Sequence, residues 1–213
     1  MKIHADLTQH AVVHTEELSW VDSPMVGVQR KMIERDGDEV ARATSLVRYA
    51  PGSSFSAHTH DGGEEFLVLE GVFSDEFGDY GPGTYIRNPV GSSHTPFSQD
   101  GCIILVKLWQ MVPEDSQRVV MHPQELMAEY DVSLVTLHSY ESELVQMIRL
   151  SAGESFRLES EERSELFILA GAMMAGDSAY ASGSWVRRPG GAALMEFSSS
   201  EGCLFYLKTG HLR

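Results

Sequence analysis

The chain has 213 residues, of which 42% are hydrophobic and 22% charged, a composition typical of one large globular domain or two small ones. Its 31 acidic residues against 16 basic ones give a formal net charge of -15. This charge argues against binding to nucleic acids or anionic membranes, because both require a basic surface. Residues 1–13 lack the apolar core of a signal peptide, and no run approaches the roughly 20 apolar residues of a membrane span. Two cysteines without a CxxC pair indicate reduced thiols, so we expect a cytoplasmic protein.

The first half of the chain reads as strands. Residues 1–25 lack helical periodicity and are expected to form a strand-like N-terminal arm. His10 and His14 lie four apart in this arm, but the segment is not helical, and we interpret the pair as incidental. From residue 26 to residue 112, short apolar runs alternate with turn signals such as Asp36-Gly37. This spacing of short strands predicts an all-β sandwich or barrel.

A short helix is expected between two domains. Residues 113–131 break the strand pattern, and Pro123–Glu129 is the best helix candidate, with proline at a tolerated first-turn position. We interpret 113–131 as a linker. Strand patterning resumes at residue 132 and continues to residue 213, which predicts a second β domain.

The two domains are an internal repeat at an offset of 100 or 101 residues. EFLVLEG, starting at Glu65, matches ELFILAG, starting at Glu165. The turn residues match as well: Gly52 with Gly153, Gly83 with Gly183, Pro89 with Pro189, and Gly91 with Gly191. Matched glycines and prolines indicate matched turns, so both halves are expected to share one fold.

The repeat separates scaffold residues from candidate functional ones. Four polar residues of the first half are lost in the second: His58 matches Glu159, His60 matches Glu161, Glu64 matches Ser164, and His94 matches Leu194. Other charged residues recur at matching positions, namely Arg48, Glu65, Arg87 and Lys107. We interpret the recurring set as scaffold ion pairs or surface charges, and the lost set as a site.

The lost set has metal-ligand spacing. His58 and His60 are two residues apart, so on a strand they point to the same face. Glu64 follows across a Gly62-Gly63 turn, and His94 comes 36 residues after His58. Three imidazoles and one carboxylate suit a divalent first-row metal such as zinc, iron, manganese or nickel. The predicted metal ligands are therefore His58, His60, Glu64 and His94.

These residues also carry a family resemblance. The spacing G-x5-H-T-H-x3-E-x6-G, from Gly52 to Gly71, resembles the first cupin motif. G-x5-P-V-G-x2-H, from Gly83 to His94, resembles the second, although Ser98 stands where that motif usually closes with asparagine. Residues 24–110 more narrowly resemble the cupin domain of the ChrR anti-sigma factor family. The resemblance implies an all-β bicupin of two tandem jelly-roll barrels, the second degenerate and without metal ligands.

For function, the resemblance implies a sensor or regulatory module that holds one divalent metal, zinc foremost. A sigma factor, a small molecule or an oxidant would be its partner or signal, and exposed barrel strands favour a homodimer. The family's sigma-binding region is an N-terminal helical domain with its own His/Cys zinc site. This chain has no HxxxCxxC pattern and no cysteine before Cys102, so anti-sigma activity does not follow from the barrel alone.

The alternative is an enzyme. Similar cupins include non-haem metal-dependent dioxygenases that cleave carbon–carbon bonds in β-diketones or hydroxy-ketones. In that case iron would be the expected metal, and the pocket would be lined by aromatic and apolar side chains that equally suit a barrel core: Phe66, Val68, Tyr85 and Phe97. The sequence leaves the choice between sensor and enzyme open.

Overall fold

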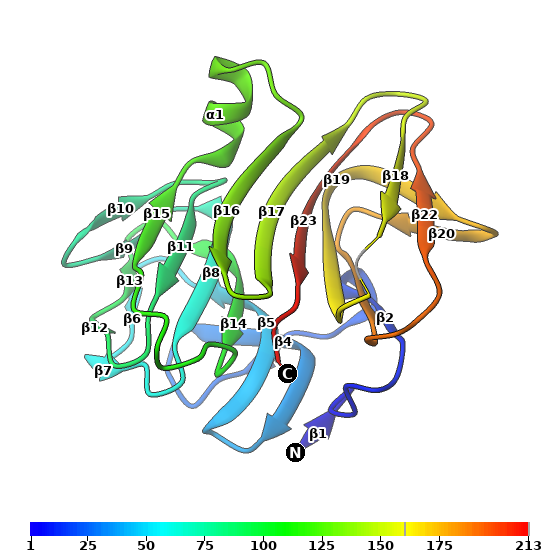
Figure 1. Cartoon of the computed structure of the whole chain (residues 1–213). Coiled ribbons are helices and arrows are strands. Elements are labelled where there is room, and N and C mark those ends of the chain that lie inside the picture. The colour runs from blue at the N-terminus through cyan, green and yellow to red at the C-terminus, as the bar shows by residue number, and fades with distance from the viewer. Residues whose placement is uncertain (160, 213) are drawn as a thin grey trace. The chain divides into compact units, whose positions relative to one another are not determined.

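The computed structural model describes residues 1–159 and 161–212 and is built almost wholly of antiparallel strands (Figure 1). The all-β prediction is therefore confirmed. The one α-helix in the described part is α1 (Pro123–Glu129), at the residues that the sequence indicated. No helix of the described residues has the length and apolar character needed to cross a membrane.

The chain divides into two compact units. Unit 1 comprises Met1–Ala5 and Leu18–Pro123, and unit 2 comprises Asp6–Glu17 and Gln124–Arg213. The expected arm, residues 1–25, is thus divided between the units. Strand β1 (Lys2–Ile3) pairs with unit 1, whereas β2 (Ala11–His14) pairs with a strand of unit 2. The expected linker, 113–131, is divided as well, because its strand β15 (Val119–Met121) extends the sheet of unit 1.

Unit 1 is a barrel of one long sheet and two short ones. The long sheet runs in the order β1, β4 (Val28–Gly37), β5 (Ala41–Tyr49), β14 (Cys102–Leu108), β8 (Glu64–Gly71), β11 (Tyr85–Asn88) and β15, with β3 (Val21–Asp22) beside β4. A second sheet has the order β10 (Gly78–Tyr80), β9 (Phe73–Asp75), β13 (Phe97–Ser98) and β6 (Ser53–Ser54). The third is the pair β7 (His58–Thr59) and β12 (Ser93–His94).

The register decides which residues of unit 1 face the barrel interior. Phe66 and Val68 of β8 lie in the buried apolar cluster with Ile104 and Val106 of β14. Glu64 shares their parity and therefore their face of the sheet. Their neighbours in β8 point to the opposite face. The alternation of β8 thus places one carboxylate at the end of an otherwise apolar row.

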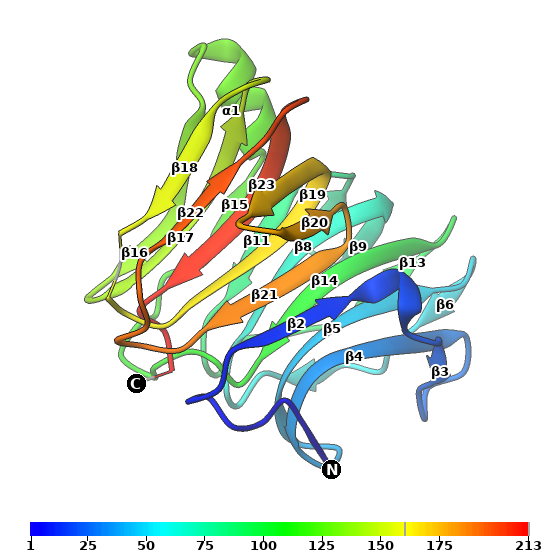
Figure 2. The same cartoon turned by 90° about the vertical axis from the view of Figure 1, so that its right-hand side faces the viewer.

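Unit 2 repeats this topology, as the sequence repeat predicted. Its sheet runs in the order β16 (Leu134–Tyr140), β17 (Glu143–Leu150), β23 (Cys203–Thr209), β19 (Ser164–Ala175), β21 (Ser184–Arg188) and β2 (Figure 2). The remaining strands are β18 (Ser155–Leu158), β20 (Ser178–Ala181) and β22 (Met195–Ser198). The order β17-β23-β19-β21 reproduces β5-β14-β8-β11. The register shift between the two central strands recurs as well. In unit 1 it falls between Ile103 and Ile104, where β14 pairs with β8, and in unit 2 between Ile168 and Ala170, where β19 pairs with β23.

Strand β2 explains why residues 1–25 do not form a separate arm. Ala11 and Val13 are buried on one face of the strand, Val12 on the other face packs against the core cluster of unit 2, and the strand pairs with β21. His14 Nδ1 lies 3.1 Å from the Ser184 hydroxyl. Because the segment is a strand, His10 and His14 do not share a helix face, which agrees with the interpretation of this pair as incidental.

Candidate metal centre

Two short strands bring the first and last predicted ligands together. β7 and β12 are antiparallel, and His94 stands directly opposite His58. His60 follows β7, and its backbone N–H donates to the Ser92 carbonyl at 2.9 Å. The turn from His60 to Glu64 requires glycine: Gly63 has φ +74°, and a Cβ on Gly62 would overlap the Trp109 indole.

The four predicted ligands form one cluster. One potential ligand atom from each of His58, His60, Glu64 and His94 lies within 4.8 Å of all the others. Glu64 Oε2 is 3.4 Å from His60 Nε2 and 3.5 Å from His94 Nε2. The three imidazole centroids are 4.7–5.1 Å apart. The structure thus brings together residues that lie on three different strands and one turn.

The cluster fits a metal ion on its own geometry. His60 Nε2 and His94 Nε2 are buried and have no hydrogen-bond partner. Buried polar nitrogens are almost always satisfied in folded proteins, and leaving one unsatisfied costs about 1–3 kcal/mol. Both orphaned atoms point toward the same carboxylate. A cation coordinated between them would satisfy the two nitrogens and balance the Glu64 charge, and imidazole with carboxylate suits first-row divalent metals.

Three further groups orient these side chains, and sequence reasoning missed them. His94 Nδ1–H donates to Asp75 Oδ2 at 3.1 Å, and His58 Nδ1–H donates to the Ser56 carbonyl at 2.9 Å. Asn88 Nδ2 donates to Glu64 Oε2 at 3.2 Å. A proton on Nδ1 leaves the Nε2 lone pair for a metal, which is how outer partners select the ligating tautomer.

The repeat contained the signal that would have found two of them. At the offset of 100 residues, Asp75 matches Ala175 and Asn88 matches Arg188. The supporting carboxylate and amide are therefore lost in unit 2 together with the four ligands they support. Extended to residues 73–88, the same comparison would have added Asp75 and Asn88 to the candidate site.

Burial and neighbouring charges shift the pKa values of His60 and His94 in opposite directions. Burial lowers the pKa of His60, and the neighbouring His94 and His58 add to this against the opposing effect of Glu64. Burial also acts to lower the pKa of His94, but the hydrogen bond to Asp75 and the Glu64 charge outweigh it, so that pKa is raised. For Asp75, burial acts to raise the pKa, and the hydrogen bond from His94 with other donors lowers it overall.

A cavity of about 430 Å³ opens on the cluster. His58, His60 and Glu64 form part of its wall. The rest is largely apolar and aromatic, including Val47, Tyr49, Phe55, Ile104, Val106 and Leu108. A pocket of this size that combines an apolar wall with a smaller number of polar groups is typical of a small-molecule site.

The pocket-lining residues expected from the sequence do not line this cavity. Phe66 and Val68 face the interior but are packed in the core, each 1% exposed. Tyr85 pairs with Leu67 and so faces the other side of the sheet, where its hydroxyl donates to Glu65 at 3.0 Å. Phe97 is 39% exposed on β13. Parity correctly placed Phe66 and Val68 on the interior face, but it could not show that they pack into the core or that the register turns Tyr85 away.

The recurring charges are scaffold, as interpreted from the repeat. Arg87 is buried and pairs with Glu65 at 2.7 Å and with Asp115 at 2.6 Å. Lys107 Nζ donates to the Thr44 hydroxyl at 3.1 Å. In unit 2 the matching carboxylate, Glu165, is also held by polar partners. It accepts a hydrogen bond from Trp185 Nε1 and lies 3.1 Å from His211 Nε2. Arg48 differs in being half-buried and lying over the Trp20 ring.

Unit 2 lacks a comparable cluster among the described residues. Glu159 and Glu161 are exposed, and Leu194 is 59% exposed. Ser164 is fully buried in β19. The positions that match the ligands therefore do not converge on one point.

The sequence matches the ChrR cupin-like domain over two segments, residues 8–112 and 119–213. The chain belongs to the ChrR cupin-like family. The two matches correspond to two tandem cupin barrels, which agrees with the predicted bicupin. No curated protein matches the chain in sequence.

Solved structures share the fold at low sequence identity. A protein from Nostoc punctiforme, described as a candidate dioxygenase, aligns with a TM-score of 0.78 at 13% identity, covering 95% of this chain and 83% of its own. Protein Ylba from E. coli gives 0.73 at 14% identity, covering 98% and 93%. The bacterial pirin YhhW from Escherichia coli, in complex with nickel(II), gives 0.69 at 10% identity, covering 94% and 98%. At these identities the likeness shows the cupin fold alone.

The hydrogen bond from His94 to Asp75 leads to the first prediction. Asp75→Asn removes the charge that holds the His94 ring, and we expect metal affinity to fall about 10- to 100-fold, the usual effect of losing such a partner. A competition titration against a chelator measures this. Asp79→Asn is the matched control, because Asp79 lies on the same hairpin but accepts from Ser74. Equal affinity in the two variants would contradict the assigned role of Asp75.

Proposed function

We propose that unit 1 is a mononuclear metal centre that acts on a small organic substrate, as a dioxygenase cleaving β-diketones or hydroxy-ketones. The observation that carries this proposal is the apolar cavity that opens on three of the four ligand side chains. A purely structural metal site is closed by protein ligands, whereas a catalytic site keeps a face open to substrate.

The protein's own residues supply binding and orientation. The apolar wall excludes water and holds the carbon skeleton of the substrate. Asn88 fixes the Glu64 carboxylate, and Asp75 fixes the His94 ring, so the polar end of the cavity is rigid. A divalent metal bound there supplies the Lewis acidity that favours the enolate form of a diketone. Cleavage of a β-diketone would then incorporate both atoms of one O₂ and give a carboxylic acid and a 1,2-dicarbonyl compound.

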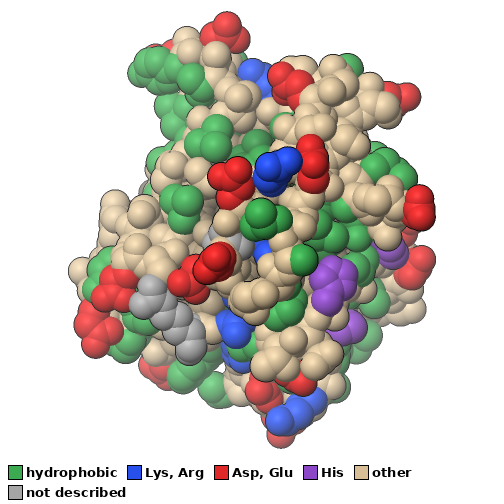
Figure 3. All heavy atoms as spheres, turned by 45° about the vertical axis from the view of Figure 1, so that its right-hand side comes forward, with side chains coloured by type: hydrophobic (Ala, Val, Ile, Leu, Met, Phe, Trp, Pro, Cys, Tyr) green, Lys and Arg blue, Asp and Glu red, His purple; other side chains and the backbone are tan. Residues whose placement is uncertain are grey.

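The charge distribution agrees with a small substrate and not with a polyanion. Figure 3 shows acidic and basic side chains interspersed over the visible face, and the described residues there form no continuous basic patch. The net charge of -15 likewise disfavours binding of a polyanion.

Oxygen uptake tests the enzymatic proposal. We expect iron-loaded protein to consume O₂ with members of a panel of β-diketones and hydroxy-ketones, one O₂ per ketone cleaved. His60→Ala should abolish uptake, since it removes a buried imidazole of the cluster. His14→Ala is the control, because that imidazole lies in unit 2. No uptake by the iron-, manganese- or nickel-loaded protein with any ketone of the panel would contradict this function.

A second candidate is favoured by the family itself. Both barrels match the ChrR cupin-like domain, which supports a regulatory module in which zinc occupies the four ligands. In this case the signal would be a small molecule or an oxidant, and the partner a sigma factor. Retention of a candidate sigma factor on the immobilised zinc-loaded protein, and its release on oxidant exposure, would support this role. Failure to retain any would count against it.

A further inference from the structure

An arginine faces the interior of the barrel beside the metal-side cavity. Arg30 of β4 pairs with Val47 of β5, and Val28 pairs with Tyr49. Val28, Val47 and Tyr49 belong to the buried interior cluster, so Arg30 shares their face of the sheet. Arg30 also forms part of the cavity wall. A cation is thus built into a mostly apolar lining, on the long sheet and away from the short strands that carry His58 and His94.

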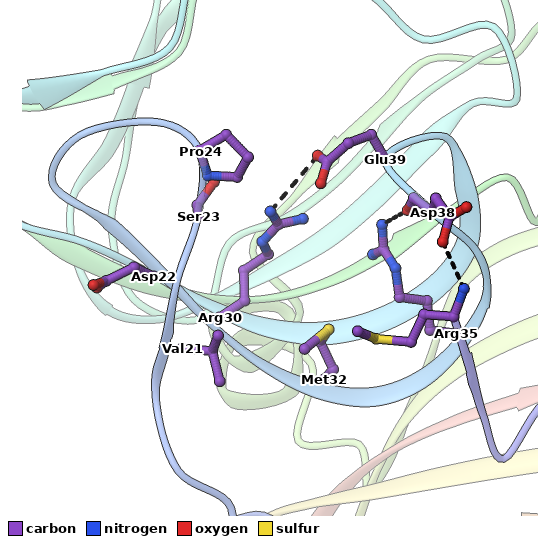
Figure 4. Close-up of a pocket in the computed structure, with 10 residues that line it drawn as sticks. Val21, Asp22, Ser23, Pro24, Arg30, Met32, Arg35, Asp38 and Glu39 are labelled. Atoms are coloured by element: carbon purple, nitrogen blue, oxygen red, sulfur yellow. Dashed lines mark hydrogen bonds and ion pairs between the residues drawn. The ribbon is translucent and has the colours of Figure 1, made fainter.

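The guanidinium of Arg30 has no hydrogen bond within the described part of the chain. Its ion-pair partner is Glu39, at 3.8 Å, beyond hydrogen-bond reach. Yet the Arg30 side chain is only 21% exposed, whereas that of Glu39 is 74% exposed. Figure 4 shows Arg30 extended toward Glu39 past Pro24, at the wall of an adjoining cavity. Within the described residues, the five donors of Arg30 are therefore engaged only by this long ion pair, and the rest of their contacts are left to solvent or a ligand.

Other arginines of unit 1 are satisfied. Arg42 Nε donates to Glu34 at 2.8 Å, and Arg87 binds two carboxylates. Arg48 donates to Gln29 on the opposite face of the same strand pair. The contrast singles out Arg30, because its donors make no hydrogen bond to the described residues and can turn to an anionic ligand.

A second positive charge lies near Arg30. Burial first, and then the charge of Arg30, lower the pKa of Arg35. Arg35 is only 5% exposed and donates to the Asp38 backbone carbonyl, so its side chain is held in place. Two arginines thus lie close together here, and the carboxylates of Glu39 and Asp38 act on Arg35 from the same region.

We infer that the ligand of the metal-side cavity carries a carboxylate that Arg30 binds, with an apolar segment between that carboxylate and the oxygen atoms at the His58, His60 and Glu64 end. This rests on the proposed function, and it names the substrate class: acidic ketones with an apolar spacer. Guanidinium is the side chain suited to such recognition, because its planar donors match the two oxygens of a carboxylate. Glu39 is the exposed counter-ion that the ligand displaces.

The test compares acids with their neutral esters. Zinc-loaded protein, which binds ketones without oxygen chemistry, is titrated by calorimetry with β-diketones whose terminal carboxylate is separated from the nearer carbonyl by two to six methylene groups. Each acid is compared with its methyl ester. At the best spacing we expect the acid to bind about tenfold or more tightly, the effect of a charge-assisted hydrogen bond. Arg30→Gln should remove this preference, so that each acid binds no more tightly than its ester.

Two variants control for folding and for charge. Arg48→Gln removes the same charge from the outer face and should keep the preference for the acid. Glu39→Gln alters an exposed side chain without risk to the core, and it should strengthen acid binding because the competing carboxylate is gone.

The outcomes separate this inference from the proposed function. Esters that bind as tightly as acids at every spacing, or a preference that survives in Arg30→Gln, would overturn the role of Arg30 and leave the metal-centred function standing. Absence of binding by both acids and esters to zinc-loaded protein would contradict the proposed function and the inference together.

Discussion

Two buried imidazole nitrogens directed at one carboxylate constrain the rest of unit 1. His60 Nε2 and His94 Nε2 have no hydrogen-bond partner and lie 3.4 and 3.5 Å from Glu64 Oε2. Three separate features hold them there: the β7–β12 pairing, the glycine turn before β8, and the β9–β10 hairpin that presents Asp75 to His94. Unit 2 keeps the hairpin, as β19–β20, but it has no counterpart of Asp75, His58, His60, Glu64 and His94. Together they make sense if a cation completes the arrangement.

Unit 2 shows what the barrel needs without that site. It keeps the strand order and the register shift of unit 1, and it keeps a buried carboxylate, Glu165, with its own donors. Its apolar core includes Phe197 and Phe205, both fully buried. The ligands and their supports are missing together. Folding of this barrel therefore depends on core burial and buried ion pairs, whereas the histidine cluster of unit 1 serves another purpose.

Local spacing indicated the four residues of the cluster, and long-range register decided the rest of the site. His58, His60 and Glu64 lie within seven residues, so period and turn chemistry sufficed to place them together. The sequence does not single out Asp75, because an aspartate at this position is typical of a turn. In the structure it does accept a hydrogen bond from the Phe77 backbone N–H, as a turn aspartate would. Tyr85 was expected in the pocket because its pairing with Leu67 is not encoded locally. For the same reason, the sequence could not predict that residues 11–14 pair with β21 at the edge of the unit 2 sheet.

Metal content per chain, measured by mass spectrometry on protein purified without a metal-affinity step, tests the central claim most directly. The expected result is one first-row divalent metal per chain in the wild type, and loss of that metal when His60 and His94 are both replaced by alanine. Iron or manganese would favour the enzyme, and stoichiometric zinc the regulatory module. A wild-type chain that binds no metal even when it is supplied, or a double variant that keeps its metal in full, would contradict the account.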